Sequence, residues 1–294
     1  MDQPLVVGVD GSGSALRAVD WAADEAALRR LPLRLVYAPL WVRYESAEFA
    51  GGSSSPDTGK LVELIVRGAA RRARRRQPDL PISTAVLSGS PEDALVRESE
   101  HAWALAVGSR GRGGVPSLLL GSVSLFVAAH AACPVIVVRG DQDPPARLSA
   151  QGRIVVGAGD TSGAAVRFAA EEADRRGSVL EVVTARRRPA AHEPVGRRGT
   201  AAAPDHAPGR RAAEALEAAL RDIPEGVTIQ QRLVDGPARH VLLDLASTAD
   251  LLVIGAGRRA GHAGLPLGRV AHTVLHHSPC PVAVVPEPPV RARG

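Results

Sequence analysis

Glycines follow a short apolar segment of this chain at a spacing suited to holding an anion. Residues 104–107 (Ala-Leu-Ala-Val) lead into Gly108, and Gly111 and Gly121 follow in the pattern Gly-x2-Gly-x9-Gly-Ser, which ends at Ser122. Glycine lets the backbone approach a phosphate without a side chain in the way. The backbone N–H groups of such a loop, together with the positive end of a following helix, attract negative charge. The pattern therefore predicts a nucleotide site.

The segments around this loop predict the elements that hold it in place. Residues 104–107 have the uninterrupted apolar composition of a buried strand, and apolar residues recur at helical spacing after Ser122. Near the N-terminus, residues 6–9 predict a strand that ends in a turn at Asp10-Gly11-Ser12, before a helix that Ser12 or Ser14 could cap. Further strands are expected at 33–38, 82–87 and 134–138, helices at 61–76 and from Ser90-Pro91 onward, and a loop at 39–60.

Strands that alternate with helices predict a parallel sheet covered on both faces. Ligands of such sheets lie at the carboxyl ends of the strands, where the strand order reverses. Asp10 and Gly108 would both lie at that edge. Asp10 also fits an ordinary turn and Ser122 fits a helix cap, so each has a structural role that needs no ligand.

The second half of the chain repeats the first. Residues 107–135 realign with residues 254–282 at a constant offset of 147, which is half of the 294 residues. The recurring residues are Gly108, Gly121, Val123, Cys133, Pro134 and Val135, which return as Gly255, Gly268, Val270, Cys280, Pro281 and Val282. We therefore expect two tandem domains, at 1–140 and 153–287, with a linker at 141–152 and a tail at 288–294.

Composition argues against several classes of protein. No apolar stretch approaches the roughly 20 residues of a membrane span, and the N-terminus has no signal-peptide pattern. Only two cysteines occur, at equivalent positions of the two halves, so no disulfide between them is expected and a reducing cytoplasm fits. No cysteine and histidine cluster has zinc spacing.

The charge is carried almost entirely by arginine. The net charge is +5, from 36 basic against 31 acidic residues, and Lys60 is the only lysine. The arginine run at 71–76 could bind nucleic acid or an anionic surface, or it could be a solvated helix end. No aromatic residue is interleaved with this run, so nucleic-acid binding is not expected.

In combination these motifs resemble the universal stress protein family, in the tandem form common in actinobacteria. The matching segments are residues 7–12 (Val-Gly-Val-Asp-Gly-Ser), the helix start at 89–91 (Gly-Ser-Pro), the glycine pattern at 108–123, and residues 133–135 (Cys-Pro-Val). The resemblance covers nearly the whole chain. It implies an α/β fold of two tandem open five-stranded parallel domains, of the adenine nucleotide α-hydrolase-like type.

The resemblance also implies ATP, with or without Mg²⁺, as the ligand of the first half. Gly8 and Asp10 would line the nucleoside end of the site, and Val36 would face the adenine. The phosphates would lie on the glycine loop and the following helix start, at Gly108, Ser109, Arg110, Gly111, Arg112, Gly113, Gly114, Gly121 and Ser122. Arg110 or Arg112 could add positive charge there, or could simply be solvated.

The second half departs from the pattern at three positions. Gly159 stands in place of Asp10, Arg258 in place of Gly111, and Arg269 in place of Ser122. The side chain of Arg258 would enter the space in which the backbone should meet a phosphate. We therefore expect the first half to hold the nucleotide.

These features indicate a regulatory ATP-binding protein of the stress response rather than an enzyme. The motifs place no catalytic residue and no metal site, and the glycine loop lacks the Gly-Lys-Ser/Thr ending of a P-loop. Two alternatives stay open. One is a slow ATPase or nucleotidyl-transfer enzyme of a related α/β class, and the other is a structural module whose nucleotide site has decayed.

The last apolar run of each half, at 134–138 and 281–285, predicts a strand at a sheet edge. The unpaired backbone groups of an edge strand favour pairing with another strand. In the resembling family, this strand pairs with its counterpart in another domain. We therefore expect the two halves to pair within one chain as a pseudo-dimer, and a weaker homodimer of chains in addition.

Overall fold

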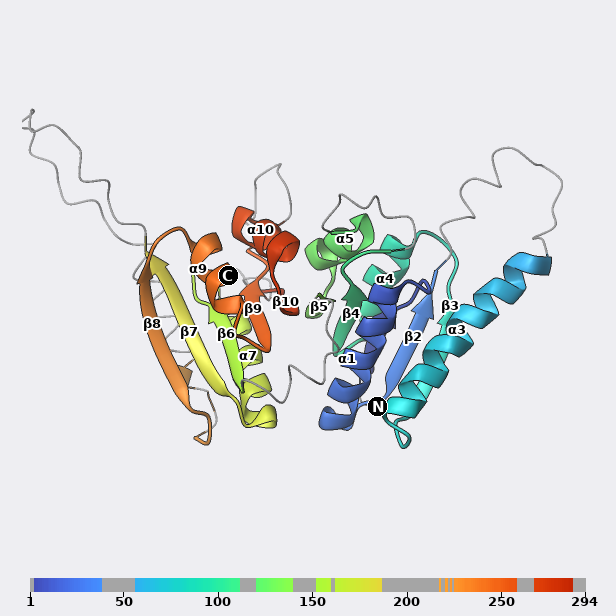
Figure 1. The fold of residues 1–294 in the computed structure, drawn as a ribbon, viewed down its shortest axis with the longest axis horizontal. Coiled ribbons are helices and arrows are strands. Elements are labelled where there is room, and N and C mark those ends of the chain that lie inside the picture. The colour runs from blue at the N-terminus through green and yellow to red at the C-terminus, as the bar shows by residue number, and fades with distance from the viewer. Residues whose placement is uncertain are drawn as a thin grey trace, which may run out of the picture.

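The structure is a computed structural model that describes residues 3–38, 56–111, 120–139, 152–159, 162–186, 225–257 and 267–287, with Glu217, Leu220, Arg221 and Ile223. Within these residues, ten strands form one sheet in the order β3-β2-β1-β4-β5-β10-β9-β6-β7-β8 (Figure 1). The first half contributes β1 (Leu5–Gly8), β2 (Leu33–Tyr37), β3 (Ile82–Val86), β4 (Ala104–Gly108) and β5 (Val135–Val138). The second half contributes β6 (Arg153–Gly157), β7 (Val179–Arg186), β8 (Ile229–Asp235), β9 (Leu251–Gly255) and β10 (Val282–Val285).

Helices cover both faces of this sheet. One face carries α1 (Gly13–Arg29), α3 (Pro56–Arg76) and α7 (Gly163–Arg176). The other face carries α4 (Pro91–Ser99), α5 (Ser122–His130), α9 (Ala238–Ala246) and α10 (Arg269–His277). Neighbouring strands within each half are parallel. The predicted fold class, two tandem open five-stranded parallel α/β domains, is therefore confirmed.

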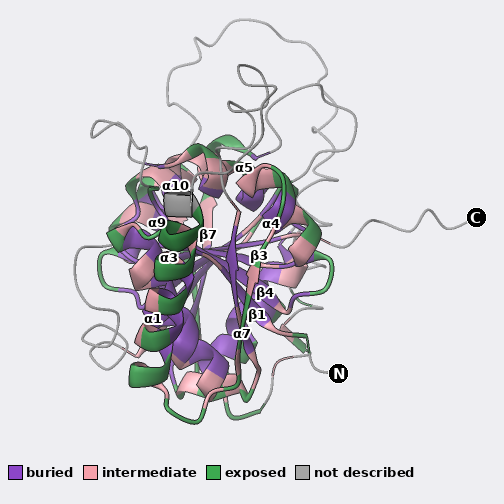
Figure 2. Cartoon of the chain, turned by 90° about the vertical axis from the view of Figure 1, so that its right-hand side faces the viewer, coloured by how far each residue is buried: buried purple, intermediate pink, exposed green. Residues whose placement is uncertain are grey.

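The strands are continuous apolar runs because both of their faces are buried. In β1, Leu5 and Val7 belong to the apolar layer under α1 and α3, whereas Val6 belongs to the layer under α4 and α5. None of the three is more than 1% exposed. Each layer contains residues of both halves, so the buried interior continues across the middle of the molecule. Figure 2, a view from one end, shows buried strands between the covering helices.

Two helices begin at the predicted capping residues, and a third begins earlier in the chain than predicted. Ser12 caps α1, because its Oγ accepts a hydrogen bond from the Ala15 N–H at 3.2 Å. Ser90 caps α4 in the same way, with the Asp93 N–H at 3.1 Å. The loop expected to last until residue 60 is wrong at its end, because α3 begins at Pro56. A proline in the first turn costs the helix no hydrogen bond, since that N–H has no partner within the helix.

The two halves join through their last strands. β5 and β10 pair antiparallel, with Val137 opposite Val282 and Val135 opposite Val284. The pairing within one chain that the edge strands predict is thus present. Val137 and Val284 are 0% and 1% exposed, so a charge placed at either would disrupt the buried layers as well as this junction. Such charges therefore do not test the pairing by itself.

A second contact between the halves is a buried cluster of four charged side chains, which we call the charge quartet. It consists of Glu25 and Arg29 on α1 and Glu172 and Arg176 on α7. Each carboxylate accepts from both arginines, and Arg176 Nε lies 2.9 Å from Glu172 Oε2. The four side chains are at most 10% exposed. Because two positive and two negative charges face one another there, the cluster is neutral.

Aromatic rings extend this contact around the quartet. The rings of Trp103 in the first half and Phe168 on α7 stack with their centroids 5.8 Å apart. The Arg29 guanidinium lies 3.9 Å from the centroid of the Trp103 ring. Such a stacked pair contributes about 0.5–1.5 kcal/mol beyond the area it buries. The halves are therefore joined by the sheet, by the quartet and by these rings.

The quartet predicts an unusual pH dependence of stability. Burial, and next the Glu172 carboxylate, raise the pKa of Glu25 to about 7. The folded state then binds more protons than the unfolded state between the ordinary pKa of a glutamate and pH 7, so this group makes the protein less stable as pH rises through that window. Against the desolvation that burial imposes, Arg176 and Arg29 hold the pKa of Glu172 below its ordinary value. The stability that ionised Glu172 contributes is therefore present above the ordinary pKa of a glutamate. It is lost only as the pH falls through the lower pKa that Glu172 has in the folded protein.

Urea unfolding of the wild type and Glu25→Gln at pH 5 and pH 7.5 measures this effect. We expect the stability difference between the two proteins to shift by up to about 3 kcal/mol in favour of the variant between these two pH values. The other titrating groups are the same in both proteins, so their effects cancel in the difference between the two free energies of unfolding. A difference that is the same at both pH values would contradict the raised pKa of Glu25.

The junction also predicts the result of cutting the chain between the halves. A protease site introduced between residues 141 and 151 should allow cleavage without separation, because β5–β10 pairing, the quartet and the ring stack all persist. Size-exclusion chromatography of the cleaved protein should give one peak that contains both fragments. Two freely separating fragments would show that these contacts are too weak to hold the halves together.

Candidate functional site

The carboxyl edge of the first half is where the predicted site residues meet. β1 lies between β2 and β4, so the ends of β1 and β4 are adjacent. Asp10 follows β1, and its Oδ1 accepts a hydrogen bond from the Ser12 N–H at 2.9 Å. This bond closes a tight turn directly before α1. Asp10 is therefore a turn residue, as its sequence context allows, and the hydrogen bond holds its carboxylate at the start of α1.

The backbone after β4 is tied to the same helix start. Ser14 Oγ donates to the Arg110 carbonyl, and the Arg110 N–H donates to Ser14 Oγ at 3.3 Å. Ser12 Oγ lies 3.3 Å from the same carbonyl oxygen. Two hydroxyls of the α1 start thus hold the first turn of the glycine loop against Asp10.

Two glycines of the loop lie close to the Asp10 turn and the start of α1, and Gly108 is required there by the close backbone. A Cβ at Gly108 would lie 2.6 Å from the Ser14 carbonyl carbon and 2.7 Å from the Ala15 nitrogen. Those atoms belong to the backbone, so no side chain could fit there without moving α1. A Cβ at Gly111 would lie 2.8 Å from Asp10 Oδ2. The absent side chain of Gly111 therefore leaves open the space in front of the Asp10 carboxylate.

The start of α5 lies beside this turn. The Gly121 N–H donates to the Ser109 carbonyl at 2.8 Å, and Ser124 Oγ donates to the Gly108 carbonyl at 2.6 Å. Gly121 is the N-cap, and no side-chain hydrogen bond caps the helix. The cap considered for Ser122 is wrong, because Ser122 is already the first helical residue. The N-terminal N–H groups of α5 are therefore not capped by the side chain of their own N-cap residue, because that residue is a glycine.

The remaining predicted residues have different positions. Gly8 is needed for packing, because a Cβ there would lie 3.0 Å from Leu95 Cδ1. Val36 is 1% exposed and belongs to the apolar layer under α4, while its carbonyl accepts from the Val9 N–H at 2.9 Å. Ser109 is also buried, so only its backbone reaches the site. Arg112, Gly113 and Gly114 lie outside the described residues.

Two arginines make this edge positively charged. Arg110 is exposed, and Arg139 follows β5 at the same edge. Arg139 reaches the second half, where it donates to the His276 carbonyl at 2.8 Å and the Ser278 carbonyl at 3.1 Å at the end of α10. Burial, and next the nearby charge of Arg110, lower the pKa of Arg139. An anion near Arg110 would relieve this repulsion.

Sequence reasoning did not find Ser124 or Arg139, and it considered Ser14 only as a cap. A serine within the first turns of a helix is common, so no pattern singled out Ser14 or Ser124. Arg139 lies at the end of the first expected domain, 1–140, and no motif singled it out. Its partners are carbonyls some 136 to 139 residues away in the sequence, which no local pattern could reveal.

The second half repeats the scaffold of the first, with a different contact at the helix start after its first strand. Gly157 takes the place of Gly8, and a Cβ there would lie 3.0 Å from Leu242 Cδ1. At the start of α7, Glu287 Oε1 accepts from the Ala164 N–H at 3.2 Å. A carboxylate of the chain itself therefore lies on the first turn of this helix. Asp160, Thr161 and Arg258 lie outside the described residues, and Arg269 is the exposed first residue of α10.

The described residues around the first site offer little for acid–base or metal chemistry. No group of three or more histidine, cysteine, aspartate or glutamate side chains is close enough to hold a metal ion in this part of the chain. Both cysteines are free and buried, as expected. Burial raises the pKa of Cys133 to about 12, so its thiol is not a nucleophile at neutral pH.

Comparison with known proteins identifies the family. The model of the universal stress protein family matches residues 1–139 and again residues 152–286. The chain belongs to the universal stress protein family. Universal stress protein Rv2005c of Mycobacterium tuberculosis is 30% identical over 286 residues, which cover 95% of this chain and 96% of that protein. Universal stress protein Rv2623 of the same organism is 30% identical over 293 residues, with 96% of each chain covered.

A solved structure shows the same fold. The crystal structure of a universal stress protein from Archaeoglobus fulgidus is similar over 97% of this chain and 98% of its own, with a TM-score of 0.67 at 18% identity. The tandem arrangement thus recurs in a universal stress protein of a distant organism. None of the helices that the structure describes is long and apolar enough to cross a membrane.

Proposed function

We propose that this universal stress protein is an ATP-binding regulatory protein of the stress response that holds its nucleotide in the first half. The observation that carries the proposal is the convergence of three backbones at one edge. The Asp10 turn, the start of α1 and the residues after β4 are tied together by Ser12 and Ser14, and Gly111 leaves the space beside the Asp10 carboxylate open. We call this arrangement the cradle, and a side chain at position 111 would compete with the Asp10 carboxylate for space in it.

The chemistry of the cradle fits a nucleotide. The N-terminal N–H groups of α5 and the glycine loop donate to phosphate oxygens. The exposed Arg110 adds positive charge on the same side. The Asp10 carboxylate repels a phosphate but accepts hydrogen bonds from ribose hydroxyls, so it suits the nucleoside end. A bound Mg²⁺ would supply charge neutralisation, and Asp10 is the carboxylate that the cradle offers it.

The asymmetry of the chain favours one nucleotide per molecule. At the start of α7, the Glu287 carboxylate accepts a hydrogen bond from the Ala164 N–H, so a side chain of the chain itself occupies the helix start that corresponds to the one beside Asp10. Arg258 replaces the glycine that leaves space open in the first half. The second half would then act as a structural partner of the first.

Binding without turnover is the simplest use of this site. Neither a histidine nor a cysteine is among the described residues that form the cradle, and Asp10 is engaged in its turn. We further propose a cytoplasmic protein, in which a homodimer of chains adds to the pairing within the chain. A slow ATPase is the second candidate, favoured only by the Asp10 carboxylate at the site.

Isothermal titration calorimetry of the full chain with ATP tests the proposal. We expect about one ATP per chain, and nucleotide extracted from the purified protein should be mainly ATP. No measurable binding, and no nucleotide in the extract, would favour the structural module with a decayed site. Two equivalent sites would show that Arg258 and Glu287 do not block the second half, and ADP formed at a steady rate would favour the ATPase.

A further inference from the structure

The arginines near the end of α3 have two different sets of surroundings. Arg72 and Arg76 face α1, where Arg72 Nε lies 2.7 Å from Asp20 Oδ1 and Arg76 Nε lies 2.7 Å from Asp24 Oδ1. Each arginine also donates from Nη2 to the second oxygen of the same carboxylate. These two arginines therefore attach α3 to α1, and they are not available to a partner.

The other arginines of this segment face outward. Arg71, Arg74 and Arg75 are exposed, and they have no hydrogen bond or ion pair within the described part of the chain. Arg67 pairs only with Glu63 one turn away at 2.7 Å, and both side chains are more than half exposed. An exposed pair of this kind contributes little, about 0.3–0.5 kcal/mol. Within the described residues, the charges of Arg71, Arg74 and Arg75 are thus not neutralised by an acidic side chain.

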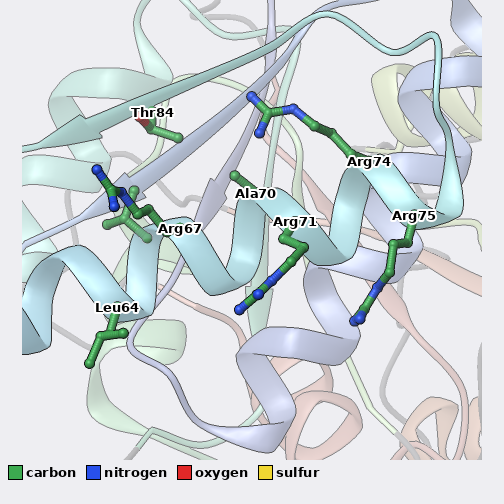
Figure 3. A pocket seen from close by; sticks show the side chains of 8 residues that line it. Leu64, Arg67, Ala70, Arg71, Arg74, Arg75 and Thr84 are labelled. Atoms are coloured by element: carbon green, nitrogen blue, oxygen red, sulfur yellow. The ribbon is translucent and has the colours of Figure 1, made fainter.

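These arginines line a hollow beside the edge of the sheet. The hollow has a volume of about 730 Å³, and its lining includes Leu64, Arg67, Arg71, Arg74, Arg75 and Thr84 (Figure 3). In Figure 3, Arg67 and Arg74 extend to the side of α3 on which Thr84 lies, whereas Arg71 and Arg75 extend to the other side. Thr84 belongs to β3, so the hollow joins the arginine side of α3 to that strand.

β3 is an edge strand, so the backbone N–H and C=O groups on its outer side are not paired with another described strand. It is the outermost strand on its side of the sheet, paired only with β2 among the described strands. Thr84 is exposed, and Val86 is an exposed apolar residue of the same strand at 57%. The strand contains no proline and no charged side chain of its own. An edge of this kind is a template for a further strand.

We propose that this edge binds an extended acidic segment of a partner protein, which adds to the sheet as a strand beside β3 while its carboxylates meet the arginines of α3. Main-chain hydrogen bonds to β3 would supply affinity. The arginine guanidiniums would select glutamate or aspartate on the side of the added strand that faces the hollow. The proposal does not depend on nucleotide binding.

Other occupants fit the hollow less well. A second copy of this edge would bring the same arginines, and like charges would repel. None of the residues that line the hollow is aromatic, so it offers no ring on which a nucleic-acid base could stack. A bilayer surface is broad and flat, whereas this site is a hollow beside a strand edge. An acidic strand matches both the charge and the shape.

Fluorescence anisotropy with a labelled ten-residue peptide that alternates glutamate and valine tests the proposal on the full chain. We expect binding at low salt that weakens as salt is added. Arg67→Glu/Arg74→Glu should bind at least about tenfold more weakly, and Arg67→Gln/Arg74→Gln should be intermediate. Arg175→Glu/Arg221→Glu changes the net charge equally at exposed sites of the second half and should bind within about twofold of the wild type.

Three outcomes would overturn the proposal. The first is equal binding by a peptide with proline at alternate positions, which cannot form a strand ladder. The second is equal loss in the Arg175→Glu/Arg221→Glu control, which would reduce the effect to net charge. The third is that the peptide does not bind, whereas phosphatidylserine vesicles or a single-stranded oligonucleotide bind and lose affinity in Arg67→Glu/Arg74→Glu. Circular dichroism of each variant confirms that α3 is still folded.

Discussion

Gly111→Arg is expected to abolish ATP binding while the fold survives. A Cβ at this position would lie 2.8 Å from Asp10 Oδ2, and the rest of an arginine side chain would fill the cradle that we assign to the nucleotide. The residue is exposed at the carboxyl edge, so the substitution leaves the buried layers untouched. We expect the affinity for ATP measured by calorimetry to fall at least about 100-fold, which corresponds to about 2.7 kcal/mol.

The control for this variant is Gly68→Arg, which introduces the same side chain at a glycine of α3 that has no atom within 4 Å of an added Cβ. It should bind ATP like the wild type. Gly111→Ala should give an intermediate loss, because only the Asp10 carboxylate must move. Unchanged ATP affinity in a folded Gly111→Arg protein would reject the placement of the nucleotide beside Asp10.

Arg29→Met is expected to destabilise the whole chain by about 3–5 kcal/mol in urea unfolding. The variant leaves Glu25 and Glu172 with only Arg176, so one buried carboxylate has no counter-charge. It also removes the guanidinium that lies over the Trp103 ring at 3.9 Å. The loss should affect both halves, because the quartet joins α1 to α7.

Two further variants separate this effect from a general one. Arg30→Met changes the exposed neighbouring residue and should cost less than about 0.5 kcal/mol. The double variant Glu25→Leu/Arg29→Met removes one positive and one negative charge together, so Glu172 and Arg176 stay paired. It should recover most of the lost stability, since apolar side chains often replace a buried ion pair without cost. An Arg29→Met protein as stable as the wild type would show that the quartet does not hold the halves together.

The two halves are built alike but have diverged in what they offer a ligand. Gly8 and Gly157 have the same packing against Leu95 and Leu242, so the scaffold is shared. In the first half, the helix start after β1 is used to hold the glycine loop. In the second half, the corresponding helix start receives the Glu287 carboxylate. The helix start after the first strand therefore has different contacts in the two halves.

The sequence by itself determined the fold class, the tandem repeat and most of the candidate site. Continuous apolar runs predicted buried parallel strands, because a strand buried on both faces, like β1, cannot alternate with polar residues. The caps at Ser12 and Ser90 follow from local hydrogen bonding between residues three apart. Gly111 and Gly121 were identified by spacing alone. These features depend on short stretches of chain, so sequence order is sufficient to find them.

Only the tertiary structure decided which residues hold these parts together. Ser14 contacts Arg110 across 96 residues, and Arg29 contacts Glu172 across 143 residues, so neither pairing has a local signal. The start of α3 at Pro56 was also missed, because proline and glycine favour a loop until packing against the sheet stabilises the helix. A residue type and its spacing indicate what a segment can form. Which distant side chain completes a charge or a hydrogen bond depends on how the elements pack, and that is decided by the buried interior as a whole.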